Sequence, residues 1–168
     1  MIADGPRELA EGPFRLREVR PEDSPSLYRW RMQEDARPMF LNTDEVPFAT
    51  HQSYYERYFQ PANTDRWFVI EHEGVPVGSI ALYGLSPDGS EYEWGRLVVA
   101  REHRGHGAAM AAFRLLLRYG RLIGVRRIRS EVLEANERVT AMHDQLGFRR
   151  AERREHDGRR FVLFVVDL

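Results

Sequence analysis

The stretch from residue 91 to residue 120 reads EYEWGRLVVAREHRGHGAAMAAFRLLLRYG. Its first nine residues, 91–99, favour a strand, and the good helix formers alanine, methionine, leucine and arginine favour a helix over 108–123. Gly105 and Gly107 lie in the loop between them, where glycine lets the backbone turn sharply and approach a ligand closely. Because the first amides of a helix lack internal partners and lie at the positive end of its dipole, this loop predicts a binding site for a diphosphate.

Two other nucleotide-binding loops also carry glycines before a helix, and the sequence excludes both. A P-loop ends in Gly-Lys-Ser/Thr, whereas this loop continues as Gly107-Ala108-Ala109. The dinucleotide-binding fingerprint needs a third glycine at position 110, which is Met110. Taken alone, the loop is equally compatible with a tight strand-to-helix turn that binds nothing.

Further elements are expected on both sides of this stretch. Strands are predicted over 14–20, 66–72, 75–83, 127–133, 148–153 and 160–166, and helices over 21–31, 48–59 and 136–146. A strand-helix-strand unit implies a parallel pair and the hairpins imply antiparallel pairs, so we expect an α/β (α+β) fold with a mixed central sheet of about seven strands. Residues 14–168 form a single domain in this interpretation, after a flexible tail over 1–13.

Composition limits the classes of function. The 168 residues include 25 basic and 26 acidic side chains, a net charge of −1, so no overall field favours nucleic acid or an anionic membrane. There is no cysteine, which excludes disulfides, thiolate metal sites and a cysteine nucleophile. No apolar run approaches the roughly 20 residues of a membrane span. We therefore expect a cytoplasmic protein, a monomer or a homodimer, that uses no metal.

Two blocks of sequence resemble the GNAT superfamily of acetyl-CoA-dependent N-acetyltransferases. Residues 104–109 (RGHGAA) resemble the signature Arg/Gln-x-x-Gly-x-Gly/Ala, and residues 136–148 (NERVTAMHDQLGF) resemble the segment Asn-x-x-Ala-x-x-Leu-Tyr-Glu-Lys-Leu-Gly-Phe. The resemblance extends over 14–168, and the N-terminal third looks like the subgroup that acetylates ribosomal-protein N-termini and nucleotide-linked amino sugars. It implies the GNAT fold, with helices on both faces of the sheet and a splayed pair formed by the fourth and fifth predicted strands, 91–99 and 127–133.

The resemblance also implies a site for acetyl-CoA. The bulged fourth strand would hold the pantetheine arm through its backbone, and the glycine loop would hold the pyrophosphate. The implied residues are Leu97, Val98, Val99, Arg104, Gly105, His106, Gly107, Ala108, Ala109 and Asn136. Asn136 would in addition cap the helix that it opens.

The implied reaction is direct attack of a primary amine on the thioester of acetyl-CoA. A lysine-like amine has a pKa of about 10.4, so a general base assists the reaction, and Glu93 is the predicted base. His143 replaces the tyrosine that protonates the leaving thiolate in many relatives; imidazole can donate a proton, with a different pH dependence. Alternatively, Glu93 is a solvated strand residue and His143 a helix residue without a catalytic role.

The acceptor amine is expected to contact Trp30, Arg31, His51 and Tyr55. A Trp-Arg-Asn element and a histidine recur in the amino-sugar enzymes, although Met32 replaces the asparagine here. Aromatic faces stack on sugars and arginines bind phosphates, yet aromatic residues at helical spacing are also typical of a core. The open acceptors are amino sugars, polyamines, aminoglycosides and protein N-termini, and the alternative is an acyl-CoA-binding module without catalysis.

Overall fold

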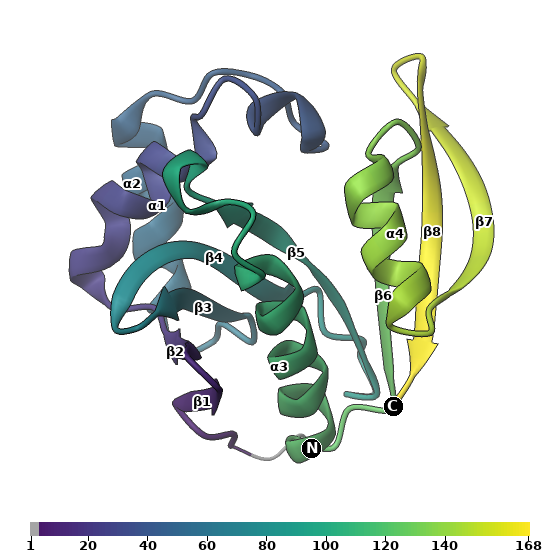
Figure 1. Cartoon of the computed structure of the whole chain (residues 1–168), viewed down its shortest axis with the longest axis horizontal. Coiled ribbons are helices and arrows are strands. Elements are labelled where there is room, and N and C mark those ends of the chain that lie inside the picture. Colours follow the sequence, from purple (N-terminus) through teal and green to yellow (C-terminus); the bar gives the residue numbers. More distant parts are fainter. Residues whose placement is uncertain (1–3) are drawn as a thin grey trace.

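The computed structural model describes residues 4–168 (Figure 1). Within these residues, eight strands form one sheet in the order β1-β2-β3-β4-β5-β6-β8-β7. The strands are β1 (Glu8–Glu11), β2 (Phe14–Glu18), β3 (Arg66–His72), β4 (Val75–Tyr83), β5 (Glu91–Val99), β6 (Arg127–Leu133), β7 (Arg149–His156) and β8 (Arg159–Asp167). β5 and β6 run parallel, and the other neighbours run antiparallel. The expected mixed sheet is confirmed.

One strand lies where a tail was expected. The prediction of a flexible tail over 1–13 is wrong for residues 8–11, which form β1 and pair with β2; residues 1–3 lie outside the described part of the chain. Only Leu9 of β1 is partly buried, so the strand has no alternation of buried and exposed side chains to reveal it. It forms through the turn at Gly12, whose φ is 58°. The sheet therefore has one strand more than predicted.

Helices cover both faces of the sheet, as expected. They are α1 (Ser24–Arg31), α2 (Phe48–Tyr58), α3 (Ala108–Leu122) and α4 (Glu137–Gln145), with short 3₁₀ turns at Pro21–Asp23, Arg37–Met39 and Arg101–His103. Trp67 of β3 packs in one cluster with Leu27 of α1 and Tyr55 of α2. Its neighbour Phe68 points to the opposite face and packs in the cluster that contains Phe113 of α3. Within residues 4–168, no helix is long and apolar enough to cross a membrane.

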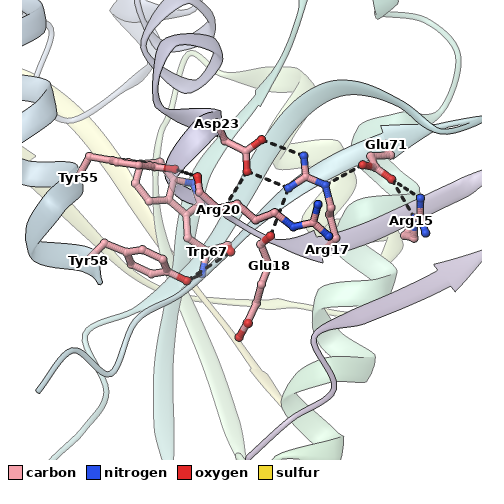
Figure 2. A network of polar contacts seen from close by, with 9 residues as sticks. All are labelled: Arg15, Arg17, Glu18, Arg20, Asp23, Tyr55, Tyr58, Trp67 and Glu71. Atoms are coloured by element: carbon pink, nitrogen blue, oxygen red, sulfur yellow. Dashed lines mark hydrogen bonds and ion pairs between the residues drawn. The ribbon is translucent and has the colours of Figure 1, made fainter. Parts of the chain in front are cut away.

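A buried ionic network joins β2 and β3 to the start of α1 (Figure 2). Arg17 donates from Nε to Glu71 at 2.7 Å and from its two terminal nitrogens to Asp23 at 2.8 Å each. The bonds to Asp23 are the largest cause of a raised pKa for Arg17, so the guanidinium stays charged although it is buried. Tyr55 of α2 donates its hydroxyl to the carbonyl oxygen of Arg20. These contacts fix α1 and α2 on the sheet, where they form one wall of the cleft described below.

β5 and β6 diverge along their length, which opens the sheet (Figure 1). They pair only where Glu91–Glu93 lies opposite Arg127–Arg129. β5 also bulges at Arg96, whose φ is 52°, and its register with β4 shifts there. The predicted splayed fourth and fifth strands are therefore β5 and β6. Beyond Glu93, no strand within residues 4–168 pairs with that edge of β5.

Candidate active site

A cleft of about 1220 Å³ opens where β5 and β6 diverge. Its walls come from α1, α2 and the segment between them, from the bulged half of β5, from the loop before α3 and from the start of α4. Among the predicted site residues, the cleft is lined by Arg31, His51, Leu97, Val98, Val99, Arg104, Gly105, Gly107, Ala108, Ala109 and Asn136. The lining does not include Trp30, Tyr55, Glu93, His106 or His143.

The loop before α3 has the conformation that its glycines predict. Gly105 and Gly107 have φ of 84° and 85°, and Gly107 is the N-cap of α3. A Cβ at Gly107 would meet only Phe14, at 3.9 Å, so glycine is needed there for its positive φ and not for space. Among the residues that the structure describes, no side chain caps this helix. The amides of its first turn, beginning with Ala108 and Ala109, are therefore available to an anion in the cleft.

Arg104 does not present a free charge to this anion site. Its Nε donates to the carbonyl oxygen of Val99 at 2.9 Å, and its terminal nitrogens form an ion pair with Asp35. The bond from Arg104 is the largest cause of the lowered pKa of Asp35. Arg104 thus joins the loop to the segment that follows α1, and its guanidinium can reach a phosphate only by leaving Asp35. The free amides of α3 are the stronger anion-binding feature.

The remaining predicted cofactor residues divide between the cleft and the surface. Asn136 lines the cleft and caps α4, its Oδ1 accepting from the amide of Val139 at 3.3 Å. The ring of His106 is exposed and lies 6.3 Å from the ring of His72, outside the cleft lining. Only the backbone of His106 therefore belongs to the loop that presents the helix amides. Arg138, in the first turn of α4, lines the cleft and was missed because no local pattern showed its direction.

His143 lies in a buried aromatic cluster. Its residue is 0% exposed, and its ring lies 4.3 Å from the ring of Phe164 and 5.1 Å from that of Trp94. The Trp94 indole, which can only donate, bonds Nε2 of His143 at 3.1 Å, and the Ser130 hydroxyl lies 2.6 Å from the same nitrogen. Nε2 is therefore the acceptor, and Nδ1 carries the proton and donates to the carbonyl oxygen of Val139 at 2.7 Å.

The structure disagrees with a direct proton-donor role for His143. Burial lowers the pKa of His143 to about 4, so the ring is neutral at pH 7. Its single N–H is bound to the backbone, and Nε2 already accepts two hydrogen bonds. The imidazole has no proton to offer to the cleft, and it does not line the cleft. The reason is the packing of Trp94 and Ser130 around the ring, which the sequence of α4 does not reveal.

The neutral His143 ring should make the fold sensitive to mild acid. Because the pKa of this histidine is about 4 in the folded protein and about 6.5 in the unfolded chain, the unfolded chain binds a proton first as the pH falls. The free energy of unfolding should thus lose about 3 kcal/mol from this residue between about pH 6.5 and pH 4. In denaturant titrations, His143→Gln should flatten that slope and His106→Gln should not. Equal slopes for the wild type and His143→Gln would contradict the assignment.

Trp30 and Tyr55 are core residues, which contradicts the prediction that they contact the acceptor. They are 4% and 1% exposed. Tyr55 also uses its hydroxyl on the backbone of Arg20 (Figure 2). Both belong to the cluster under α1 and α2 that includes Trp67. The helical spacing of these aromatic residues therefore marks the faces of α1 and α2 that pack on the sheet.

Glu93 lies where β5 and β6 are still paired, and it contacts the cleft only through a neighbour. Its Oε1 accepts from the Tyr83 hydroxyl at 3.2 Å, and Tyr83 and Gly95 line the cleft. A Cβ at Gly95 would lie 2.6 Å from the Tyr83 hydroxyl oxygen, so the glycine makes room for this hydroxyl. Burial and then the charge of Glu93 raise the pKa of Tyr83, which keeps the hydroxyl protonated. Sequence reasoning missed Tyr83, although 83 and 93 are cross-strand partners in the β4–β5 pair.

Comparisons with known proteins agree with this architecture. The model of the acetyltransferase (GNAT) family matches residues 21–148. A spermidine N-acetyltransferase from Vibrio cholerae, solved in complex with CoA and spermine, has a TM-score of 0.83 and 16% identity over 94% of this chain and 96% of that chain. A ribosomal-protein-alanine N-acetyltransferase from Brucella melitensis has a TM-score of 0.75 and 19% identity over 91% of this chain and 99% of that chain.

The two solved structures share the fold of this chain, and a search of curated proteins finds no match. The family match covers both the glycine loop before α3 and the block that forms α4. These are the two segments whose ends meet at the cleft. The chain belongs to the acetyltransferase (GNAT) family of acetyl-CoA-dependent N-acetyltransferases.

Proposed function

We propose that this protein transfers the acetyl group of acetyl-CoA to a primary amine of a small molecule. The observation that carries the proposal is the uncapped first turn of α3 beside the unpaired edge of β5 in one cleft. The amides of that turn suit the diphosphate of CoA, and the backbone of 97–99 suits its pantetheine arm. Asn136, at the start of α4, contributes from the opposite side of the diverging strands.

Tyr83 and Glu93 supply the base in this proposal. Acetyl-CoA brings an activated thioester, and the attacking amine has to lose a proton. As the amine proton passes to the Tyr83 oxygen, the Tyr83 hydroxyl proton passes along the existing 3.2 Å hydrogen bond to Glu93, so charge and protons balance. Tyr83 is the residue that contacts the amine, and Glu93 is the final proton acceptor. The leaving thiolate takes its proton from water, since His143 has none to give.

The charged side chains that line the cleft indicate which charge the acceptor amine should carry. Within residues 4–168, the lining contains the arginines Arg31, Arg57, Arg96, Arg104 and Arg138 and the carboxylates Asp35, Glu131 and Glu137. Asp35 is paired with Arg104, and Glu131 lies 2.6 Å from His156. A polyamine needs free carboxylates along its length. Glu131 also lies 4.0 Å from Arg154, so among the residues that the structure describes Glu137 is the one lining carboxylate without an ion pair. Arg96 and Arg104 are themselves paired, with Asp65 and Asp35, so within residues 4–168 the lining arginines without an ion pair are Arg31, Arg57 and Arg138. This distribution favours a neutral or anionic amine, such as an amino sugar, over a polyamine.

Acetyl-CoA should stabilise the protein and release thiol in the presence of a suitable amine. A ligand at 100 times its Kd stabilises the native state by about 2.7 kcal/mol, which raises Tm by several degrees in a domain of this size. ADP, which has the diphosphate without the arm, is the control and should give a smaller shift. The absence of any shift at millimolar acetyl-CoA would contradict the proposal. A shift without thiol release across a broad amine panel would instead indicate a binding module.

A further inference from the structure

Arg31, the last residue of α1, is a cation without an anionic partner in the described part of the chain, residues 4–168. Its Nη2 donates to the carbonyl oxygen of Asn42, and its guanidinium carbon lies 3.9 Å from the centre of the Phe40 ring. Its Nη1 is buried and has no hydrogen-bond partner within residues 4–168. Burial and then repulsion by Arg37 lower the pKa of Arg31. The side chain is partly buried, and Nη1 is the nitrogen that an oxygen ligand could satisfy.

His51, in α2, lines the same cleft, and one of its ring nitrogens also has no hydrogen-bond partner within residues 4–168. The residue is 9% exposed, and its ring stacks with Phe48 at 6.1 Å and with Tyr55 at 5.9 Å. Its Nε2 is buried without a partner within residues 4–168. Burial is the main cause that lowers the pKa of His51, and the charge of Arg31 adds to it, so the two side chains act on each other. Both line the cleft.

One kind of ligand satisfies both nitrogens. An anionic oxygen group accepts from Arg31 Nη1, whereas a cationic group would be repelled by Arg31. The other ring nitrogen of His51 bonds the backbone of Ser24 and the lowered pKa keeps the ring neutral, so Nε2 accepts a hydrogen bond from a hydroxyl or N–H of the same ligand. α1 and α2 lie on the face of the sheet opposite α3, whose first turn suits the diphosphate of CoA. We therefore assign an anion held by Arg31 to the other substrate. Because Asp35, four residues after Arg31, pairs with Arg104 of the loop before α3, a CoA phosphate is the competing occupant, and with that occupant Arg31→Met would slow every acceptor alike.

Building on the proposed function, we propose that Arg31 binds an anionic group, a carboxylate or a phosphate, on the acceptor amine, and that His51 Nε2 accepts a hydrogen bond from the same substrate. The site makes the protein prefer amines that carry an anion and reject polycations. The acceptor has to provide hydrogen-bond partners for Arg31 Nη1 and His51 Nε2. These two nitrogens lie in a cleft whose lining has more arginines than carboxylates. The Phe40 ring against the guanidinium holds Arg31 in place for that contact.

Matched pairs of amines test the site directly. Thiol release is measured with alanine against alaninamide, with phosphoethanolamine against ethanolamine, with glucosamine 6-phosphate against glucosamine, and with spermidine. In at least one pair, kcat/KM should be about 10-fold or more higher for the anionic member, and the pair that responds tells carboxylate from phosphate. Arg31→Met should remove about 10- to 100-fold from the anionic member and leave its neutral partner nearly unchanged. Arg29→Met, which removes an exposed arginine of the same helix, is the matched control.

Several outcomes would overturn the anion site. They are equal use of neutral and anionic partners, preference for spermidine, or an Arg31→Met variant that slows every acceptor alike. His51→Asn is the second variant, and Tm identifies any variant that fails to fold. If no amine in the panel is acetylated, the Tm of the CoA-bound protein is measured with propionate and with ethyl phosphate, and stabilisation by neither overturns the site. Failure of acetyl-CoA itself to bind would contradict the proposed function, whereas acetylation without anion preference contradicts only the site.

Discussion

Replacing Gly107 by aspartate should raise the Kd for acetyl-CoA by at least about 100-fold while the fold survives. The side chain would stand at the N-cap of α3, where its carboxylate competes for the first-turn amides that suit the diphosphate. The carboxylate would also repel the diphosphate. The repulsion between two like unit charges 4 Å apart is about 4 kcal/mol at an effective dielectric constant of 20. Aspartate tolerates positive φ better than most residues, and the site leaves room for a Cβ.

Gly107→Asn is the matched control for this experiment. Asparagine has nearly the shape of aspartate and also tolerates the φ of 85°, but it carries no charge. Its acetyl-CoA affinity should stay within about 10-fold of the wild type, as isothermal titration calorimetry can measure. Tm values of the two variants should lie close together. If both variants bind acetyl-CoA equally well, the diphosphate does not sit on the first turn of α3.

The sequence predicted the parts of the fold that depend on local chemistry. The helix formers of α3 and the two glycines before it determine their own conformation, so this strand-loop-helix unit was predicted with limits correct to within one residue. The alternating and apolar runs of β3 and β4 likewise identify strands. β1 was missed because its contacts, the pairing with β2 and the ion pair of Glu11 with Arg114 of α3, arise only in the assembled fold.

The candidate site was harder to predict, because a helical pattern does not show which face meets the core. Trp30 and Arg31 are adjacent in sequence, yet one is buried in the core and the other lines the cleft. Arg104 pairs with Asp35, which is 69 residues away, and this pairing changes the charge that the loop presents. The state of His143 depends on Trp94, 49 residues away in β5. Such partners follow from tertiary packing and carry no local signal.

Tyr83→Phe should lower kcat by about 100- to 1000-fold with little change in acetyl-CoA affinity. Glu93 does not line the cleft. Within the described residues, its hydrogen bond from the Tyr83 hydroxyl is what connects it to the cleft, and Tyr83→Phe removes that bond. General base catalysis contributes about 10²- to 10⁴-fold, which sets the size of the loss. Glu93→Gln should have a similar effect, because an amide accepts the hydrogen bond but does not take the proton. Gly95→Ala should do the same by a different cause, since its Cβ would occupy the space 2.6 Å from the Tyr83 oxygen.

Glu91→Gln is the control for this series. It removes a carboxylate two residues away on the same strand, one that pairs with Arg127 and does not line the cleft. Its kcat should match the wild type, measured by thiol release at saturating acetyl-CoA. Tyr83→Phe, Glu93→Gln and Gly95→Ala all disturb the same hydrogen bond, so we expect them to lower kcat to a similar extent. The double variant Tyr83→Phe/Glu93→Gln should lose little more activity than either single variant. Wild-type kcat in Tyr83→Phe would place the base elsewhere, and a large additive loss in the double variant would show that the two residues act separately.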